Sequence, residues 1–281
     1  MAISAAKMLA PEGLSDSIMG SGTEILERIE QALKEAIGVV SQFASGSLKA
    51  DLKPFDGSPV TEADRSVNRA LHAFLVREGE GWLSEEDIDD LERLKKERVW
   101  IVDPLDGTRE FIAGVPEWCI SVAMIECGQA VAGGVCNPAT GELFLGSRQT
   151  GVTYNGRQAR TTSKDCLEGA VVLASRTEVE LGEWECFHGA SLVVQPMGSV
   201  AYKLARVAVG LADATWTLNP KSEWDIAAGT ALVEAAGGYV QFLPNSRPAF
   251  NRKVTRLPGV LACGTALREP ITSLLGRGSQ R

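Results

Sequence analysis

The sequence predicts an α/β protein built from two layered subdomains, an α+β part followed by an α/β part, that meet near residue 165. Two observations support this fold class. In the first part, two helical patterns precede a buried strand and an antiparallel meander, whereas from about Cys166 strands alternate with helices. We divide the 281 residues into an N-terminal extension (1–20), an α+β subdomain (21–165) and an α/β subdomain (166–281). No low-complexity linker separates the halves, so we expect them to pack tightly.

Two amphipathic helices are expected in the α+β part, over residues 21–43 and 61–77. Their apolar residues recur at helical spacing, as Ile25, Leu26, Ile29, Leu33, Ile37 and Val40 in the first and Val67, Leu71, Phe74 and Leu75 in the second. Each helix also begins with the spacing of a capping box, in which a Ser or Thr precedes an acidic residue by three positions. The pairs are Ser21 with Glu24 and Thr61 with Asp64.

The strands are predicted from short apolar runs bounded by turn residues. In the α+β part these runs cover residues 99–102, 119–125, 129–135, 142–145 and 151–156. In the α/β part we expect strands over residues 171–174, 192–195 and 260–263, and helices over 200–210 and 222–236. Gly237 and Gly238 follow the last of these helices and predict its end.

Composition excludes several classes of function. The net charge of −8 argues against a nucleic-acid polymer as partner, because binding a phosphate backbone requires a basic face. No apolar run approaches the roughly 18 residues of a membrane span, so no stable membrane insertion is expected. The six cysteines form no C-x-x-C pair, which predicts reduced, mostly buried thiols in a cytoplasmic protein. Only His72 and His188 are present, so the chemistry is expected to depend on carboxylates.

The segment DPLDGT (103–108) carries the strongest chemical signal. Two aspartates leave a buried strand three residues apart, and carboxylates this close need a cation between them or a retained proton. Because these donors are oxygens, they favour Mg²⁺ over Zn²⁺. The amides of Gly107 and Thr108 lie where a helix N-terminus would attract a phosphate. A plain Asp-Gly turn capped by Asp106 is the structural alternative, but it leaves Asp103 without a role.

Haloacid-dehalogenase-like phosphatases offer a competing interpretation of this segment. They carry D-x-D-G-T after a strand and use the first aspartate as a nucleophile. Here the spacing is D-x-x-D-G-T, and the extra residue would change the direction in which both carboxylates point. The spacing therefore decides against that family.

Three further acidic residues are ambiguous when each is taken alone. Asp225 can be a ligand, or it can be the capping-box partner of Ser222 at a helix start. Glu85 can belong to a solvated loop, or it can point into a site from the end of a strand. Asp64 can cap its own helix, or it can orient a water through Thr108.

Taken together, four segments resemble a single family. They are SPVTEAD (58–64), WLSEE (82–86), DPLDGTREF (103–111) and SEWDIAAG (222–229). In this order they resemble the inositol monophosphatase superfamily of lithium-sensitive, Mg²⁺-dependent phosphatases, over roughly residues 25–264. The resemblance implies a layered αβαβα sandwich. The E-F after DGT-R and the S-E-W-D form look most like the bacterial 3′(2′),5′-bisphosphate nucleotidases of sulfate assimilation.

The resemblance also implies a metal centre of two to three Mg²⁺ ions that Li⁺ would inhibit. The first ion would be held by Glu85, Asp103 and the carbonyl of Leu105. A second would be held by Asp103, Asp106 and Asp225, and a third would contact Glu85 through water. A homodimer is expected on the same grounds.

The implied catalytic residues are Asp64, Thr108 and Glu85, which would position and activate the attacking water. The implied substrate contacts are Leu105, Asp106, Gly107, Thr108, Gly198, Ser199, Lys203 and Asp225. Lys53 precedes SPVTEAD, where a phosphate-neutralising lysine often occurs in this superfamily.

The expected partner is a small phosphorylated substrate, and the expected activity is hydrolysis of 3′(2′)-phosphoadenosine 5′-phosphate to AMP and phosphate. Inositol-1-monophosphatase, fructose-1,6-bisphosphatase and histidinol-phosphatase activities remain alternatives. Tyr202 and Trp216 are candidates to face an adenine, with core packing as their more ordinary role. A catalytically silent metal-binding scaffold is the non-enzymatic alternative, and the complete set of site residues argues against it.

Overall fold

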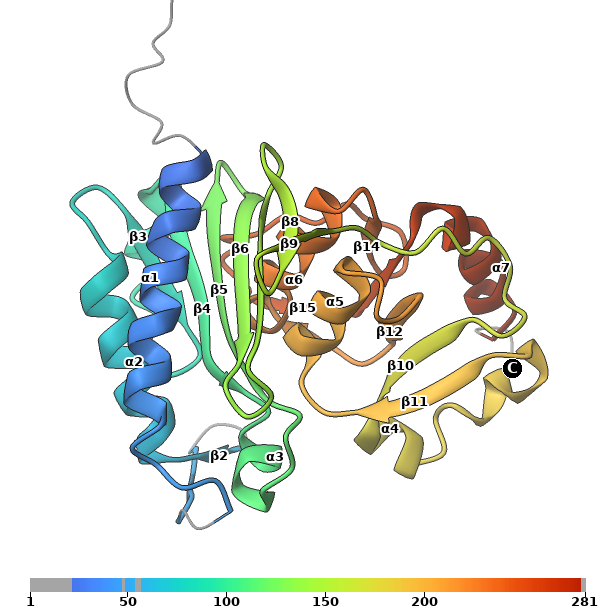
Figure 1. Cartoon of the computed structure of the whole chain (residues 1–281), viewed down its shortest axis with the longest axis horizontal. Helices are drawn as coiled ribbons and strands as arrows, with labels where there is room; N and C mark the ends of the chain where they lie inside the picture. The colour runs from blue at the N-terminus through green and yellow to red at the C-terminus, as the bar shows by residue number, and fades with distance from the viewer. Residues whose placement is uncertain (1–21, 47–48, 54–56, 279–281) are drawn as a thin grey trace, which may run out of the picture.

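The computed structural model describes residues 22–46, 49–53 and 57–278, which form alternating layers of helix and sheet (Figure 1). Helices α1 (Gly22–Val40) and α2 (Glu62–Leu75) cover one face of a seven-stranded sheet. Helices α5 (Val200–Ala208) and α6 (Glu223–Ala235) lie between this sheet and a five-stranded one, and α7 (Arg268–Gly278) lies beyond the second sheet. The predicted αβαβα sandwich is therefore confirmed.

The first sheet has the order β3-β4-β5-β6-β7-β8-β9. Its strands are β3 (Gly81–Ser84), β4 (Arg98–Asp106), β5 (Cys119–Glu126), β6 (Gln129–Asn137), β7 (Glu142–Ser147), β8 (Gly151–Tyr154) and β9 (Arg157–Ala159). Only β3 and β4 are parallel, and the rest form the predicted antiparallel meander. The main difference from prediction is β4, which we expected to end at Val102. It continues to Asp106 because its pairing with β5 resumes beyond a bulge.

The second sheet has the order β11-β10-β12-β16-β14 and is mixed. Its strands are β10 (Val171–Ser175), β11 (Val193–Met197), β12 (Ala214–Thr217), β14 (Tyr239–Phe242) and β16 (Val260–Cys263). Strands β12 and β14 were not predicted, because threonine and glutamine interrupt these four-residue strands and leave no apolar run. Helix α7 and the short helix α4 (Arg176–Glu180) were not predicted either.

Short elements complete the fold. They are the pairs β1 (Asp51–Leu52) with β2 (Pro59–Val60) and β13 (Lys221–Ser222) with β15 (Arg256–Leu257), the helix α3 (Thr108–Ala113), and the 3₁₀ turns η1 (Glu92–Lys95), η2 (Glu185–Ala190) and η3 (Thr265–Leu267).

The predicted helix starts agree with the structure where it describes them. Thr61 caps α2, and the capping box with Asp64 is present. The helix ends two residues before the predicted limit, since Val76 is already extended. At the end of α6, Gly237 has the left-handed backbone (φ 77°) that favours glycine after a helix. The predicted extension 1–20 and the capping residue Ser21 lie outside the described residues.

The largest hydrophobic cluster contains buried residues of both halves of the chain. It packs α5 and α6 against both sheets, with Ile101 and Phe144 from the first and Leu173 and Ala262 from the second. A subdomain boundary near residue 165 stays a prediction. Tyr202 and Trp216 are both buried, as their core interpretation requires.

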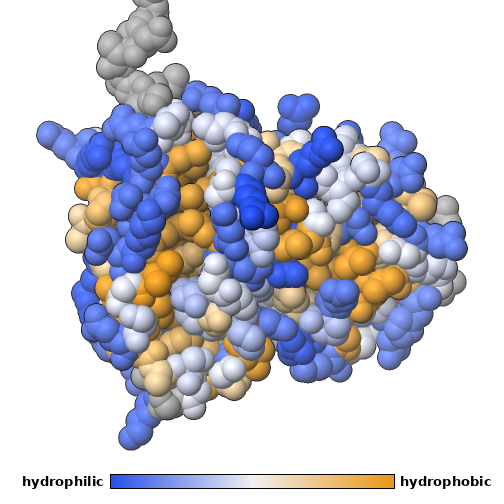
Figure 2. Space-filling view, in the orientation of Figure 1, coloured by the Kyte–Doolittle hydropathy of each residue, from blue (hydrophilic) through white to orange (hydrophobic). Residues whose placement is uncertain are grey.

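Surface properties agree only in part with expectation. On the face shown in Figure 2, hydrophobic residues appear as separate patches among hydrophilic ones. Within the described ranges, no helix has the length and apolar character that crossing a bilayer requires.

The cysteines are free, but the prediction that most are buried was wrong: Cys119, Cys136 and Cys263 are buried, whereas Cys127, Cys166 and Cys186 are exposed. The exposed thiols lie at a turn, in a connection and in a 3₁₀ turn rather than inside strands.

Candidate active site

Two of the predicted ligands, Asp103 and Asp106, lie together on β4 because of a β-bulge. Residues three apart in a regular strand point to opposite faces of the sheet. Here Asp103 pairs with Ser121 and Asp106 with Cys119, so β4 contains one more residue than β5 between these pairs. The extra residue brings both carboxylates to the same side. Pro104, which cannot donate a ladder hydrogen bond, lies in this bulge.

Glu85 reaches the same place from the neighbouring strand. Strands β3 and β4 are parallel, with Ser84 opposite Val102. The amide of Glu85 donates to the Val102 carbonyl at 3.4 Å, so Glu85 lies beside Asp103 as the two strands leave the sheet. A loop position was one of the two interpretations of Glu85, and the structure instead places it at the end of a strand and next to the aspartates.

Asp225 comes from the other half of the chain. It occupies the third position of α6, where its Oδ2 accepts from the amide of Ser222 at 2.8 Å. This helix packs closely against β6, because a Cβ on Gly133 of β6 would lie 2.6 Å from the Ala228 carbonyl oxygen. Asp225 is thus both a capping residue and a member of the carboxylate cluster.

Burial and mutual repulsion dominate the electrostatics of these four carboxylates. Burial, with repulsion from Glu85, Asp106 and Asp225, holds the pKa of Asp103 well above its usual value. Burial, with repulsion from Asp106 and Glu85, raises the pKa of Asp225 to about 8. Burial also raises the pKa of Glu85 and that of Asp106. Groups that oppose their own ionisation in this way are stabilised by a cation.

Lys53 provides positive charge at one edge of the cluster. Its Nζ lies 2.6 Å from Glu85 Oε1 and 2.8 Å from Glu86 Oε1. Burial is the largest single influence and disfavours the charged form, but the charges and hydrogen bonds of Glu85 and Glu86 together outweigh it and raise the pKa of Lys53 above its usual range. From the sequence, Lys53 could be named only by its position before SPVTEAD, because the loop that carries it has no regular pattern that would predict its contacts.

The donor chemistry of the cluster suits a hard divalent cation. All four side chains offer carboxylate oxygens, which are the ligands that Mg²⁺ prefers. In the described part of the chain, no group of three or more Asp, Glu, His or Cys residues has its side chains arranged to hold a metal ion. Within the cluster, Glu85 instead pairs with Lys53, and Asp106 accepts a hydrogen bond from Ser199 Oγ.

Asp64 and Thr108 form a hydrogen-bonded pair beside the cluster. The Thr108 hydroxyl lies 2.9 Å from Asp64 Oδ1 and 3.1 Å from the carbonyl oxygen of Leu105. The other oxygen of Asp64 accepts from the amide of Thr61 at 2.8 Å. Asp64 therefore caps α2 and also contacts Thr108, so the two interpretations of this residue are compatible.

A pocket of about 220 Å³ opens onto these groups. Of the predicted site residues, it is lined by Glu85, Asp103, Leu105, Asp106, Gly107, Thr108, Gly198, Ser199, Lys203 and Asp225. Asp64 joins them through Thr108. Gly107 has φ 100°, and a Cβ there would lie 2.9 Å from the Glu117 carbonyl oxygen, so only glycine fits this close turn before α3.

Several pocket residues were not among the predicted site residues. Arg109 and Glu110 belong to the DPLDGTREF segment but had no contact assigned to them, and Ser175, Arg176 and Thr177, where α4 begins, had no signal in the sequence; all five line the pocket. Arg176 donates to Glu117 Oε2 at 2.5 Å, and the same oxygen accepts from the amide of Gly198 at 2.8 Å. These residues are separated by tens of positions, so only the fold brings them together.

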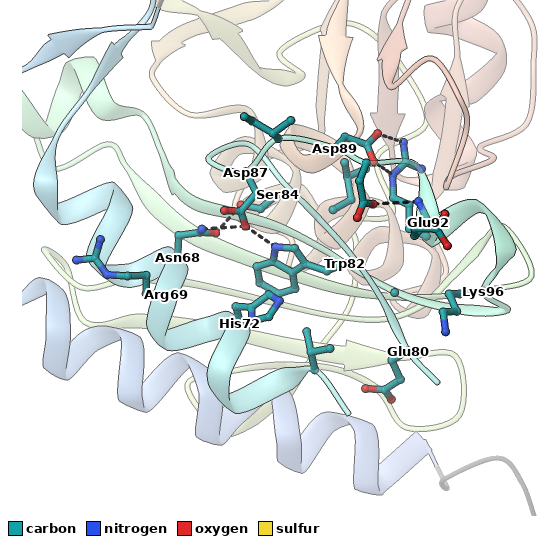
Figure 3. A pocket seen from close by; sticks show the side chains of 16 residues that line it. Asn68, Arg69, His72, Glu80, Trp82, Ser84, Asp87, Asp89, Glu92 and Lys96 are labelled. Atoms are coloured by element: carbon teal, nitrogen blue, oxygen red, sulfur yellow. Dashed lines mark hydrogen bonds and ion pairs between the residues drawn. The ribbon is translucent and has the colours of Figure 1, made fainter. Parts of the chain in front are cut away.

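A second hydrogen-bonded group includes Ser84, the residue that precedes Glu85 in the chain (Figure 3). Ser84 Oγ donates to Asn68 at 2.7 Å, and Asn68 Nδ2 donates to Asp87 at 2.9 Å. The indole of Trp82 donates to the same Asp87 oxygen at 2.6 Å. These bonds fix the turn that carries Glu85. A larger hollow of about 600 Å³ adjoins them, but none of the four clustered carboxylates lines it.

Comparison with known proteins identifies the family. The family model described as "Inositol monophosphatase family" matches residues 22–271. The chain belongs to the inositol monophosphatase family. Members of this family are phosphoric monoester hydrolases that use divalent metal ions, typically Mg²⁺, and this chain is accordingly a phosphatase of that family.

Individual relatives of the inositol monophosphatase family cover most of the chain. An inositol-1-monophosphatase of Mesorhizobium japonicum is 35% identical over 226 residues, which is 75% of this chain and 82% of that protein. The Nus factor SuhB of Pseudomonas aeruginosa is 33% identical over 229 residues, or 74% and 80% of the two chains. The crystal structure of CysQ from Bacteroides thetaiotaomicron has a TM-score of 0.70 and 27% identity, and covers 86% of this chain and 97% of that one.

Proposed function

We propose that this phosphatase hydrolyses 3′(2′)-phosphoadenosine 5′-phosphate to AMP and phosphate with two to three Mg²⁺ ions. The observation that carries the proposal is the convergence of Glu85, Asp103, Asp106 and Asp225 in one buried, self-repelling cluster. The Asp64–Thr108 pair lies beside it. All of these groups border or adjoin a single pocket.

The proposed ligands are those that the family resemblance implies, and the cluster supports them by bringing the same carboxylates together. Glu85, Asp103 and the carbonyl of Leu105 would hold one ion, and Asp103, Asp106 and Asp225 a second. A third would contact Glu85 through water, and Li⁺ would compete for the same centre. When bound, Mg²⁺ supplies positive charge to the attacking and leaving oxygens of the phosphate ester.

The protein groups next to the ions handle the proton and the phosphate. The Thr108 hydroxyl donates to Asp64, so its oxygen is free to accept a proton from the attacking water, and Asp64 can take up the proton in turn. Glu85 helps to place that water. Gly107 and Thr108, with their amides at the start of α3, are proposed to bind the phosphate, and Gly198 is proposed to contact the rest of the substrate.

The choice of a substrate with two phosphates rests on charge in the pocket. Arg109 lines the pocket and makes no ion pair with another described residue. Arg176 also lines the pocket, and its one ion pair among the described residues is with Glu117. Positive side chains outside the carboxylate cluster suit a second anionic group. Free cysteines favour a reducing, cytoplasmic location, and a homodimer is proposed by resemblance alone.

Inositol-1-monophosphatase activity is the second candidate, favoured by the name of the 35% identical relative. A substrate panel separates the two. Phosphate release would be measured from 3′-phosphoadenosine 5′-phosphate, inositol 1-phosphate, fructose 1,6-bisphosphate and histidinol phosphate, with Mg²⁺ and with excess chelator. The proposal predicts the highest kcat/KM for the adenosine bisphosphate and none with chelator. A higher kcat/KM for inositol 1-phosphate would overturn the substrate assignment and leave the phosphatase intact.

A further inference from the structure

Lys203 is a buried cation whose partners are main-chain carbonyls. Its side chain on α5 is only 4% exposed. The ammonium donates to the carbonyl oxygens of Met197 at 3.2 Å, Gly198 at 3.3 Å and Ser199 at 2.9 Å. An ammonium has three N–H donors, so these contacts use all of them. Lysine is almost never fully buried without a partner, and this position therefore needs a structural reason.

The three carbonyls belong to the turn that leads from β11 into α5. At the end of this turn, Ser199 has a left-handed backbone (φ 53°), which residues other than glycine rarely adopt. Such a conformation persists only where the surrounding structure determines it. The ammonium of Lys203 donates to three consecutive carbonyls of this turn, and these hydrogen bonds favour its observed path.

The turn in its fixed form holds one oxygen of Asp106. Ser199 Oγ donates to Asp106 Oδ2 at 2.7 Å, and the amide of Ala201 donates to the same oxygen at 2.6 Å. The Ser199 hydroxyl also accepts from the amide of Tyr202 at 3.1 Å, so it is engaged as donor and as acceptor. Because both bonds to Asp106 go to Oδ2, Oδ1 is the oxygen left for a cation.

We propose that Lys203 is a positioning residue for the metal centre, which fixes the turn at residues 197–199 so that Ser199 and Ala201 hold Asp106 in its metal-binding orientation. This inference rests on the proposed function. It replaces the direct substrate contact that the family resemblance implies for Lys203 and Ser199, because the polar hydrogens of both side chains are already used within the protein.

The test measures metal binding and turnover separately. Binding of Mn²⁺ to the substrate-free protein would be followed by electron paramagnetic resonance for wild type, Lys203→Met and Ser199→Ala. Changes in residues that orient metal ligands typically weaken metal affinity 10- to 100-fold. Of the Mn²⁺ ions that bind, we expect the one bound most weakly to lose affinity about 10-fold in each variant. The KM for substrate at saturating Mg²⁺ should change by less than about 3-fold. The double variant should be no weaker than the worse single one, since both act through Asp106.

Arg206→Met is the matched control on the same helix. Its guanidinium contacts Glu142 and the Tyr202 hydroxyl, each at 3.2 Å, and not the turn. We expect its Mn²⁺ affinity to match that of wild type. If Lys203→Met kept wild-type Mn²⁺ affinity and raised only the KM, Lys203 would be a substrate ligand and the inference would be wrong.

Ser199→Ala keeps the test decisive if Lys203→Met does not fold, because it removes only the hydroxyl that contacts Asp106. Unchanged Mn²⁺ affinity in Ser199→Ala would overturn the inference. A wild-type protein with metal-dependent turnover would still support the proposed function in that case. A wild-type protein that neither binds Mn²⁺ nor hydrolyses phosphate esters would instead overturn the proposed function itself.

Discussion

The hydroxyl of Thr108 lies 2.9 Å from Oδ1 of Asp64, and this contact joins the start of α3 to the start of α2 across 44 residues of sequence. The other oxygen of Asp64 is held by Thr61. Asp64 is therefore fixed from one side and presents its second oxygen to Thr108. We interpret the pair as the proton acceptor for the attacking water, and its consequences can be measured.

Thr108→Ala should lower kcat by about 10²- to 10⁴-fold, the usual contribution of a positioned acid-base group, with the KM changed by less than about 3-fold. Thr108→Ser keeps the hydroxyl and serves as the matched control, which should retain most of the activity. Steady-state kinetics on the preferred substrate would check both. Near-normal kcat in Thr108→Ala would exclude Thr108 from the proton path.

Asp103→Asn should abolish turnover and yet stabilise the metal-free protein. Asp103 is repelled by Glu85, Asp106 and Asp225, so removing its charge relieves the cluster. A gain of about 1 kcal/mol raises Tm by roughly 2–4 °C in a protein of this size. Thermal unfolding with chelator would show the gain, and Mg²⁺ should no longer raise Tm. Asp165→Asn, at an exposed site, is the control, and a lower Tm for chelated Asp103→Asn would contradict the repulsion.

The stability of the chelated protein should fall as pH rises from about 4 to about 8. Burial and repulsion from Asp106 and Glu85 raise the pKa of Asp225 to about 8, so the folded protein keeps a proton that the unfolded chain releases near pH 4. A folded state that binds more protons than the unfolded state loses stability as pH increases. The rise in Tm on adding Mg²⁺ should therefore be larger at pH 8 than at pH 5.

Asp225→Asn should make this fall in stability smaller, because it removes one of the four carboxyl groups whose pKa is raised. The measurement is Tm with chelator and with Mg²⁺ at both pH values. A chelated wild-type protein that becomes more stable between pH 5 and pH 8 would show that the cluster does not retain protons.

Gly107→Ala should destabilise the protein and impair phosphate binding. Its φ of 100° strains any residue with a Cβ, and that Cβ would also lie 2.9 Å from the Glu117 carbonyl oxygen. Gly156→Ala is the matched control, since Gly156 has φ 76° but open space around its Cβ position. An incompatible backbone costs more than about 1 kcal/mol, so denaturant unfolding should show a loss in both, larger at Gly107. Equal losses would argue against the close contact.

Arg109→Met should raise the KM for 3′-phosphoadenosine 5′-phosphate by about 2- to 5-fold, since an exposed ion pair contributes up to about 1 kcal/mol. The KM for adenosine 3′-monophosphate, which lacks the second phosphate, should not change. Arg69→Met, outside the pocket, is the control. Equal effects of Arg109→Met on both substrates would show that Arg109 does not recognise a second anionic group.

The sequence could point to the aspartates that the structure brings together because they occur in short local patterns. Asp103 and Asp106 are three residues apart after an apolar run, and Asp225 follows the Ser that caps its helix. Such patterns depend on few neighbouring residues. The bulge that puts both aspartates on one side was not predicted, because it depends on the register with β5.

The rest of the site depends on contacts across long stretches of chain. Glu117, Arg176 and Gly198 meet only because α4 and the turn before α5 approach the end of β4. The sequence resemblance placed Lys203 near the substrate, but only the path of the turn shows that its ammonium is directed at carbonyls. The short strands β12 and β14 were missed for a related reason, since their pairing with β16 rather than an apolar run defines them.

The most direct test of a metal-dependent phosphatase is phosphate release from 3′-phosphoadenosine 5′-phosphate as a function of free Mg²⁺, set by a chelator. The account predicts no release without Mg²⁺, a sigmoidal rise that requires more than one ion, and no rise in the Asp103→Asn variant. Release that is unchanged by excess chelator would contradict it.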